Sequence, residues 1–157
     1  MYKNTFQVAW ITNDVERAAR VFKEEQGIDL AVIPGFSLEV FGGEPLVIDV
    51  ALGYVGDLQF EVIEPVSGPT NLYTRHLPAS GEYVLKYHHL CNRIDSVAEY
   101  EELLASYRNR GVTIEVDGSF GDSGRYFYAD TRDSLGVYQE YAHLDSNTDF
   151  LDSLPRN

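Results

Sequence analysis

Cysteine is nearly absent from this chain of 157 residues, because Cys91 is the only one. An internal disulfide and a zinc site built from several thiolates are therefore excluded. The sequence also lacks an apolar run approaching the roughly 20 residues that cross a bilayer, and residues 1–10 contain no hydrophobic signal core. We therefore expect a cytoplasmic protein without a membrane partner.

Positive charge is scarce as well, with 12 Lys and Arg against 25 Asp and Glu and a formal net charge of -13. Phosphate-rich partners would be repelled, which argues against nucleic acid and an anionic membrane surface. In contrast, 44% of the residues are hydrophobic, and the chain has 11 Tyr and 8 Phe. This globular composition can build a core around a pocket, so a small molecule is the expected partner.

The first part of the chain predicts one strand, one helix and three more strands. Residues 6–12, FQVAWIT, have the composition of a strand. Residues 13–27 carry apolar side chains at the i, i+3, i+4, i+7 spacing of an amphipathic helix and end in glycine. Further strands are predicted around 30–33, 45–52 and 57–64, between turns that contain glycine or proline.

The same order returns after a proline-containing connector at 66–85. The segment 88–94 predicts a strand, and Ser96 with Glu99 forms a capping box at the start of a helix that Gly111 closes. Strands are then predicted near 112–116, 125–129 and 136–142.

A duplicated module accounts for this recurring order. We predict a single domain over residues 1–144, made of one repeat at 5–65 and a second at 86–144. Residues 145–157 form an acidic C-terminal tail, which we expect to lie on the surface.

Aligning the halves by strand register places polar residues with ligating atoms at equivalent positions. Gln7 falls on His89 in the first strands, and Glu61 falls on Glu140 in the last strands. Adjacent strand residues point to opposite faces, so only one of two neighbouring histidines can enter a shared interior, and the register selects His89. We expect His88 to face outward or to pack under the connector.

The stretches FEVIEPVSGPTNLYTRHL at 60–77 and YHHLCNRIDSV at 87–97 resemble the vicinal oxygen chelate superfamily, and most of all its methylmalonyl-CoA epimerase-like and glyoxalase I-like members. The resemblance covers roughly residues 5–144. It implies an α+β fold in which two βαβββ modules curve their sheets around a central cavity that holds a metal ion. The metal ligands implied by the resemblance are Gln7, Glu61, His89 and Glu140.

One imidazole, one amide oxygen and two carboxylates are mostly hard ligands. They suit an octahedral divalent ion such as Zn, Ni, Co, Mn or Mg. Four protein ligands leave two neighbouring positions for water or for substrate oxygens. Such an ion would stabilise the negative charge that forms when a proton is removed next to a carbonyl.

The same resemblance assigns roles in catalysis and substrate binding. It implies that Glu140 is the catalytic base and that Asp49, in LVIDVALG, is a second acid/base, since Asp49 falls roughly where some epimerases carry another carboxylate. Arg93 stands four residues after His89 and therefore on the same face of the strand. Its guanidinium suits a substrate anion, and a salt bridge to a neighbouring carboxylate is the alternative interpretation.

These features predict an epimerase or isomerase, or a lyase with the same metal chemistry, acting on a carbonyl compound such as an acyl-CoA or a bulky aromatic molecule. The resemblance also implies a homodimer. The alternative is a metal-free protein of the bleomycin-resistance type, whose cavity binds a drug or antibiotic. The remaining reactive side chains have plainer interpretations, because we expect Cys91 to fill space and His76 and His143 to be exposed.

Overall fold

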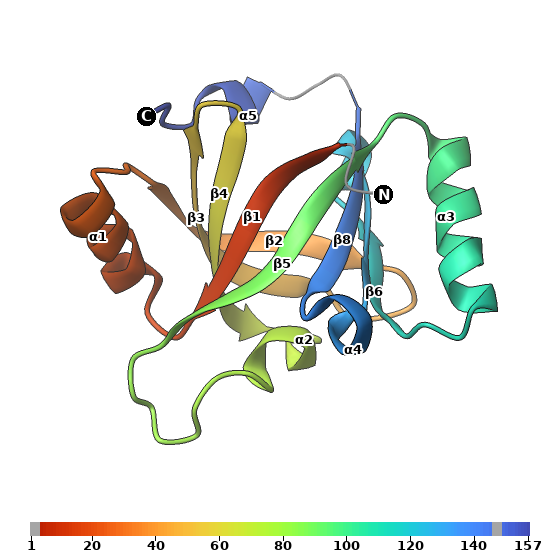
Figure 1. Ribbon diagram of the computed structural model, residues 1–157, viewed down its shortest axis with the longest axis horizontal. Helices are drawn as coiled ribbons and strands as arrows, with labels where there is room; N and C mark the ends of the chain where they lie inside the picture. Colours follow the sequence, from red (N-terminus) through yellow and green to blue (C-terminus); the bar gives the residue numbers. More distant parts are fainter. Residues whose placement is uncertain (1–3, 146–148) are drawn as a thin grey trace.

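A closed barrel of eight strands forms the body of the molecule, and the computed structural model describes its residues 4–145 and 149–157 (Figure 1). The strand order is β1-β4-β3-β2-β6-β7-β8-β5, with β5 closing on β1. The strands are β1 (Thr5–Thr12), β2 (Ala31–Val40), β3 (Leu46–Val55), β4 (Leu58–Ser67), β5 (Leu85–Ile94), β6 (Ile114–Ser119), β7 (Gly124–Ala129) and β8 (Tyr138–Leu144). The helices are α1 (Val15–Gln26), α2 (Asn71–Thr74), α3 (Val97–Asn109), α4 (Arg132–Leu135) and α5 (Asp149–Asp152), with a 3-10 turn η1 (Gly121–Ser123). Within these residues, no helix is long and apolar enough to cross a bilayer.

Helix α1 covers one side of the barrel. Asp14 caps it by accepting a hydrogen bond from the backbone N–H of Arg17, and Gly27 ends it in the left-handed conformation with φ 71°. Its buried stripe packs against outward-facing side chains of the sheet such as Ala51 and Val62. The helical period of the sequence is therefore satisfied by burial of one face on the barrel.

Helix α3 covers the opposite side (Figure 1). The hydroxyl of Ser96 accepts a hydrogen bond from the backbone N–H of Glu99, as the predicted capping box requires. Three side chains of α3 are buried against β5, β7 and β8, namely Tyr100, Leu104 and Tyr107. The two helices thus shield the outer faces of the two halves, which leaves the inner faces to form a common interior.

The two halves pair their strands in the same register. In each half the first strand runs parallel to the last, and equivalent residues of the two halves take equivalent partners. The pairs are Gln7 with Gln59 and Ala9 with Glu61 in the first half, and His89 with Tyr138 and Cys91 with Glu140 in the second. The alignment that equated Gln7 with His89 and Glu61 with Glu140 is therefore the alignment that the strand pairing follows.

Strand β2 is longer than the predicted strand at 30–33. It continues to Val40 because its pairing with β3 is interrupted by a bulge between Ile33 and Phe36 and then resumes. Gly35, with φ 64°, lies in this bulge. Pro34 and Gly35 signal a turn in the sequence, whereas the structure uses them inside a bulged strand. The extension lets β2 pair with β6 and close the barrel between the halves.

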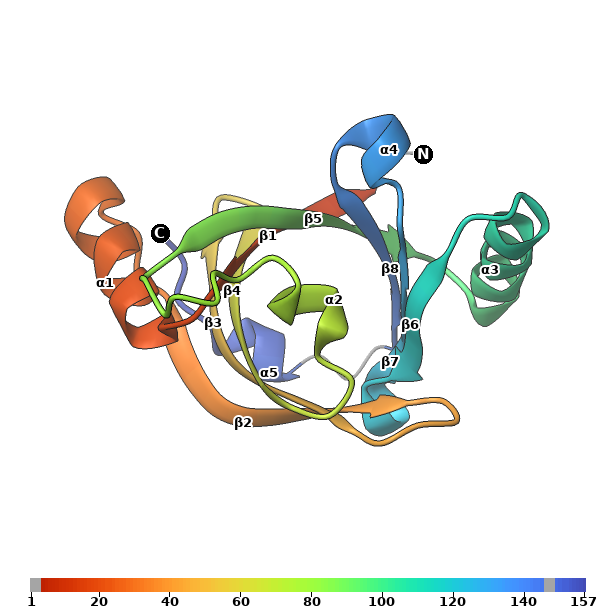
Figure 2. The same cartoon turned by 90° about the horizontal axis from the view of Figure 1, so that it is seen from below.

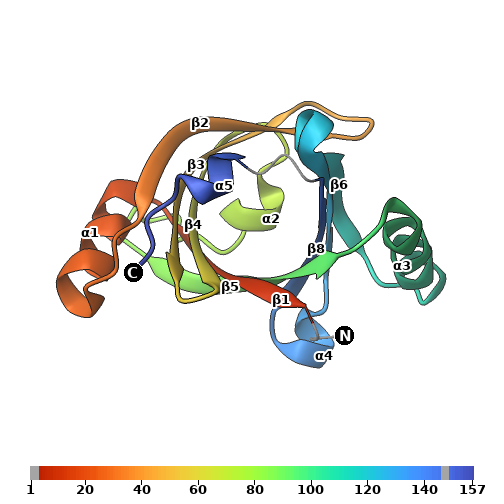
Figure 3. The same cartoon turned by 90° about the horizontal axis from the view of Figure 1, so that it is seen from above.

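Short helices cover the two ends of the barrel. Figure 2 shows α2 across the lower end, and Figure 3 shows α5 across the upper end. The prediction of a surface tail holds for most of residues 150–157 but is wrong for Leu154, which is buried in the main core. The backbone N–H of Tyr54 also donates to the carbonyl of Pro155 at 2.8 Å. The C-terminus therefore belongs to the barrel.

Candidate metal centre

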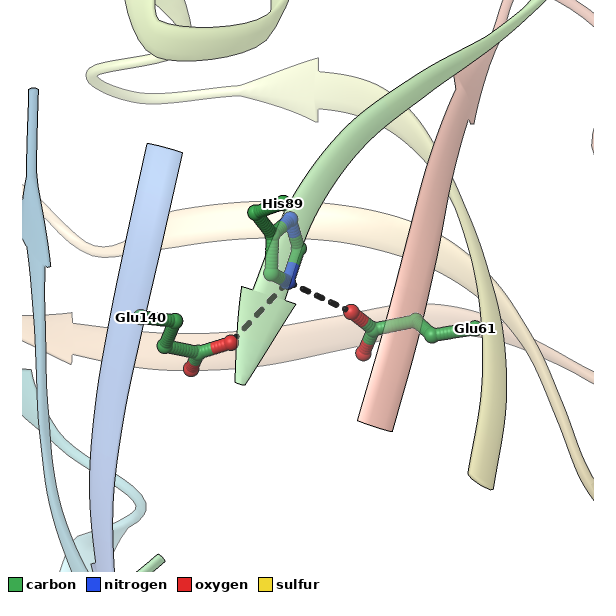
Figure 4. Close-up of side chains that lie close together, drawn as sticks. All are labelled: Glu61, His89 and Glu140. Atoms are coloured by element: carbon green, nitrogen blue, oxygen red, sulfur yellow. Dashed lines mark ion pairs between the residues drawn. The ribbon is translucent and has the colours of Figure 1, made fainter. Parts of the chain in front are cut away.

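Three side chains from three strands meet inside the barrel. The Nε2 atom of His89 lies 3.3 Å from a carboxylate oxygen of Glu61 and 3.0 Å from one of Glu140. Figure 4 shows both carboxylates approaching the same ring nitrogen from opposite sides. Their potential ligand atoms all lie within 4.8 Å of one another. This spacing allows one small cation to contact all three groups.

Strand register brings these groups together. Ala9 of β1 pairs with Glu61 on one side and with His89 on the other. Cys91 points to the same face as His89 and pairs with Glu140 of β8. The four strands therefore present His89 and the two carboxylates on their inner face, although the residues are far apart in the sequence.

Gln7 lies beside this cluster, in the cavity that Glu61 and Glu140 line. Its Nε2 donates a hydrogen bond to the side-chain Oε1 of Gln59 at 2.7 Å. Its own Oε1 atom is buried without a hydrogen-bond partner in the described part of the chain, whereas Oε2 of Glu61 lies 3.3 Å from Nε2 of His89. Because a buried oxygen that finds no donor is costly, the free Oε1 of Gln7 fits a cation, which would satisfy it.

His88 fixes the orientation and tautomer of His89. Its Nε2 lies 3.1 Å from the carbonyl oxygen of Leu72, which can only accept, so this nitrogen carries the hydrogen. Burial and the neighbouring His89 hold the pKa of His88 well below its usual value, so its Nδ1 is an acceptor. At 2.9 Å it accepts from Nδ1 of His89. The Nε2 lone pair of neutral His89 then faces the carboxylates, which is the arrangement of a metal-ligating histidine.

Burial and the neighbouring charges shift the pKa values of His89 and Glu61. Burial by itself lowers the pKa of His89, but hydrogen bonds and charge from Glu140 and Glu61 outweigh it and raise the pKa to about 9. Burial raises the pKa of Glu61, against the effect of His89. The two carboxylates therefore favour positive charge at the point where they meet the imidazole.

The remaining groups around the cluster stay neutral. Burial, followed by the charge of Glu140, raises the pKa of the Cys91 thiol well above its usual value, so this thiol is a poor nucleophile. Burial likewise raises the pKa of Tyr128, whose hydroxyl lies 3.4 Å from Nε2 of His89. Cys91 has the buried position in the main core that a space-filling residue requires.

Asp49 requires a correction. It pairs with Glu64 on the outer face of β3 and β4, whereas its neighbours Ile48 and Val50 point into the core. Its carboxylate accepts a hydrogen bond from the backbone N–H of Gly35 at 2.7 Å. The alternation of the strand therefore turns Asp49 away from the cluster, and it cannot act there as a second acid/base.

Arg93 stays outside the cavity. It has the inward parity predicted for it, but it stands at the end of β5, where it is exposed. Burial raises the pKa of Tyr54 at the same end of the barrel, and the charge of Arg93 partly opposes this effect. Among the described residues it has no salt bridge within 4.0 Å. The structure therefore places Arg93 near the barrel end and does not bring it to the cluster of His89, Glu61 and Glu140.

Two histidines differ from their prediction as exposed residues. His76 is half-buried, with Nε2 2.9 Å from the hydroxyl of Tyr138. His143 places Nδ1 3.0 Å from the carbonyl oxygen of Ile94. His88 packs under the connector against Leu72, which was one of the two positions expected for it. Neither His76 nor His143 belongs to the cluster, so both keep structural roles.

Solved structures identify the fold. A Streptomyces coelicolor methylmalonyl-CoA epimerase variant in complex with 2-nitronate-propionyl-CoA matches with a TM-score of 0.58 and 15% identity, over 91% of this chain and 95% of that one. The Mycobacterium tuberculosis methylmalonyl-CoA epimerase matches with a TM-score of 0.58 and 13% identity, over 94% and 91%. The chain has the vicinal oxygen chelate fold. No protein-family model matches the chain, and no curated protein matches it by sequence.

The predicted α+β architecture of the vicinal oxygen chelate fold is thus confirmed. The structural similarity, with a TM-score of 0.58 for both proteins, establishes the fold. The identities of 15% and 13% are too low to establish the reaction. Two residues support the predicted ligands in ways that the sequence did not predict: Gln59 holds the amide of Gln7, and His88 orients His89. Only His88 carried a signal in the sequence, because it is the neighbour of a predicted ligand. Gln59 contacts Gln7 through the pairing of two strands, which the sequence does not show.

Proposed function

We propose that this protein is a divalent-metal-dependent enzyme of the glyoxalase and epimerase type, which moves a proton at the carbon next to a carbonyl group. The observation that carries the proposal is the convergence of His89, Glu61 and Glu140 inside a closed barrel. The unpartnered amide oxygen of Gln7 in the same cavity adds to it. Structures with this fold include epimerases bound to acyl-CoA compounds.

His89, Glu61, Glu140 and Gln7 would hold the ion, and their donor set suits Zn, Ni, Co, Mn or Mg. When bound, a divalent ion supplies a Lewis acid that polarises a carbonyl oxygen. The chain supplies the geometry: His88 orients the imidazole, and Gln59 holds the amide of Gln7. His89, Glu140 and Gln7 are buried in the barrel, and burial strengthens their electrostatic effect.

Glu140 is the proposed base. It faces the cavity, and its second carboxylate oxygen is free of the contact to His89 (Figure 4). Glu61 takes the role of second acid/base that the resemblance implied for Asp49. It stands on β4 and contacts Nε2 of His89 from the side opposite Glu140. Two carboxylates on opposite sides of a bound carbon are the arrangement that epimerisation needs, with one removing the proton and the other returning it.

Metal binding provides the first test. The purified protein, stripped with a chelator, is loaded in turn with Zn, Ni, Co, Mn and Mg and analysed for bound metal after gel filtration. We expect one ion per chain, lost in His89→Ala and retained in the control His76→Ala, which removes a half-buried histidine outside the cluster. A wild-type protein that retains none of these ions would reject the proposal.

Proton transfer provides the second test. The metal-loaded enzyme is incubated in deuterated water with acyl-CoA thioesters and aromatic hydroxyketones, and exchange of the hydrogen next to the carbonyl is followed by mass spectrometry. Exchange should be lost in Glu140→Gln while metal is retained. In Glu61→Gln we expect exchange from one stereoisomer to persist while its conversion into the other stops. Unchanged exchange in Glu140→Gln would eliminate Glu140 as the base.

A metal-free binding protein is the second candidate. The observation in its favour is a cavity whose lining is mostly aromatic and aliphatic. A protonated His89 could also offset the charge of the two carboxylates, because burial lowers its pKa but the carboxylates outweigh burial and raise it to about 9. Ligand binding that survives chelator treatment and His89→Ala would support this candidate. The predicted homodimer accompanies either proposal and is tested by the mass of the protein in solution.

A further inference from the structure

A cavity of about 270 Å³ extends from the metal cluster toward α5. At its inner end lie Glu61 and Glu140, with Gln7 and Cys91 beside them. Four phenylalanines and three leucines form most of the remaining wall: Phe6, Phe36, Phe120, Phe150, Leu52, Leu144 and Leu151. For comparison, a dry cavity of about 150 Å³ holds a benzene molecule. The space therefore accepts a chelating head and a ring-sized group.

The C-terminal segment at 149–157 supplies one wall of this cavity. Phe150 and Leu151 line it, and the ring of Phe150 stacks on Phe36 with centroids 6.3 Å apart and an interplanar angle of 21°. Figure 3 shows α5 lying over the upper end of the barrel. Phe150 is nevertheless 44% exposed, so a large apolar ring stands at the cavity mouth with much of its surface uncovered.

The segment is anchored independently of its contact with the cavity. Leu154 is buried in the core, and Pro155 accepts a hydrogen bond from the backbone of Tyr54. Asn157 donates to the carbonyl oxygens of Asp29 and Tyr54 and accepts from the backbone N–H of Asp29. Phe150 and Leu151 are therefore held at the mouth by a fixed support, as specificity-determining residues require.

Charge limits what the cavity can accept. Among the described residues, no lysine or arginine lines it, and its only charged groups are the two carboxylates of the metal cluster. A substrate carboxylate or phosphate that is not itself chelated by the ion would meet no positively charged side chain in this space, and its burial among apolar groups would be costly. Arg93, exposed at the end of β5, is outside the lining.

We infer that the cavity selects a substrate whose group next to the chelated oxygens is uncharged and of aromatic-ring size, and that Phe150 and Leu151 of the C-terminal segment form the binding surface for that group. This inference rests on the proposed function for the chelated oxygens and goes beyond it in naming the neighbouring group. It disfavours substrates that carry a second carboxylate at that position.

Hydroxamates test the inference because they share one chelating head with two neighbouring oxygens. Acetohydroxamate carries a methyl group, benzohydroxamate a phenyl ring, and succinic monohydroxamate a carboxylate. Each is titrated into cobalt-loaded protein, and the visible absorption of the ion reports binding. We expect benzohydroxamate to bind at least about tenfold more tightly than acetohydroxamate, because it buries additional apolar surface. Succinic monohydroxamate should bind more weakly than acetohydroxamate.

Phe150→Ala should reduce the preference for benzohydroxamate over acetohydroxamate to about threefold or less, because the substitution removes a phenyl ring from the wall that contacts the ligand. Leu151→Ala, at the same wall, should reduce it in the same direction. The matched control is Phe41→Ala, which removes an exposed phenylalanine outside the cavity and should leave the preference unchanged. Equal binding of the three hydroxamates, or a phenyl preference that survives both wall variants, would overturn the inference.

The same variants separate this inference from the proposed function. Neutral, fluorescent 2-acetylnaphthalene is titrated into chelator-treated protein, where no ion contributes. Binding that weakens in Phe150→Ala and not in Phe41→Ala supports the aromatic wall even if cobalt is not retained, which would reject only the metal proposal. Cobalt retention without any ring preference in either titration would reject the wall and leave the metal site intact.

Discussion

Replacing His88 by phenylalanine should weaken the proposed metal binding without changing any of the proposed ligands. His88 is buried between Leu72 and His89, and it accepts the Nδ1 hydrogen of His89 at 2.9 Å. A phenyl ring fills the same space but accepts no hydrogen bond there. His89 would then be left with a buried donor that has no acceptor, or would rotate and lose the orientation of its Nε2 lone pair.

The size of the effect follows from these two contacts. A buried donor without its partner costs about 1–3 kcal/mol, and loss of a partner of a metal-ligating histidine lowers metal affinity by about 10- to 100-fold. That range corresponds to about 1.4–2.8 kcal/mol, so the two estimates agree. Affinity for zinc or cobalt is measured in competition with a chromophoric chelator. His88→Asn is the control, because its side-chain carbonyl can accept the same hydrogen.

Unfolding in urea with a chelator present separates affinity from stability, since His88→Phe also leaves the carbonyl of Leu72 without its donor. We expect His88→Asn to retain most of the affinity that His88→Phe loses. Wild-type affinity in His88→Phe would refute the reasoning, because the orientation of His89 would then not depend on its neighbour.

The remaining predictions concern stability and its link to the site. Leu154→Ala should lower the free energy of unfolding by about 2–5 kcal/mol, as for other buried leucines, and a loss below about 1 kcal/mol in urea denaturation would show that the tail does not belong to the core. A metal at 100 times its dissociation constant should raise the free energy of unfolding by about 2.7 kcal/mol; thermal unfolding should show the increase in wild type and not in His89→Ala. Asp14→Ala removes the cap of α1 and should cost about 1 kcal/mol; metal affinity should stay unchanged, since a large drop would mean that α1 is coupled to the site.

Several parts of the fold could be predicted because they depend on local patterns. The stripe of α1, its end at Gly27 and the capping box at Ser96 are short-range features, and they identify the two helices directly. Strand parity likewise separates His89 from His88 once one face is known to be buried. The extension of β2 past Pro34 was missed, because a bulge is permitted only by its pairing partner.

Asp49 illustrates a limit of reasoning by resemblance. Its position along the chain is close to that of a second carboxylate, but its strand turns it to the outer face. A shift of one residue exchanges the two faces of a strand, and a loop of uncertain length hides such a shift. The second carboxylate that contacts His89 together with Glu140 is Glu61, which the alignment of the two halves had already matched with Glu140.

The sequence by itself determined the two long helices, the approximate positions of the strands, the alignment of the two halves and the residue types able to hold a divalent ion. These depend on periodicity, capping and donor chemistry, which are local properties of the chain. The tertiary structure decided which of those residues meet, how His88 supports His89, and that the segment 149–157 forms one wall of the cavity. These depend on strand pairing and on packing between distant segments, because a single register shift or an added wall changes the site without changing any local pattern.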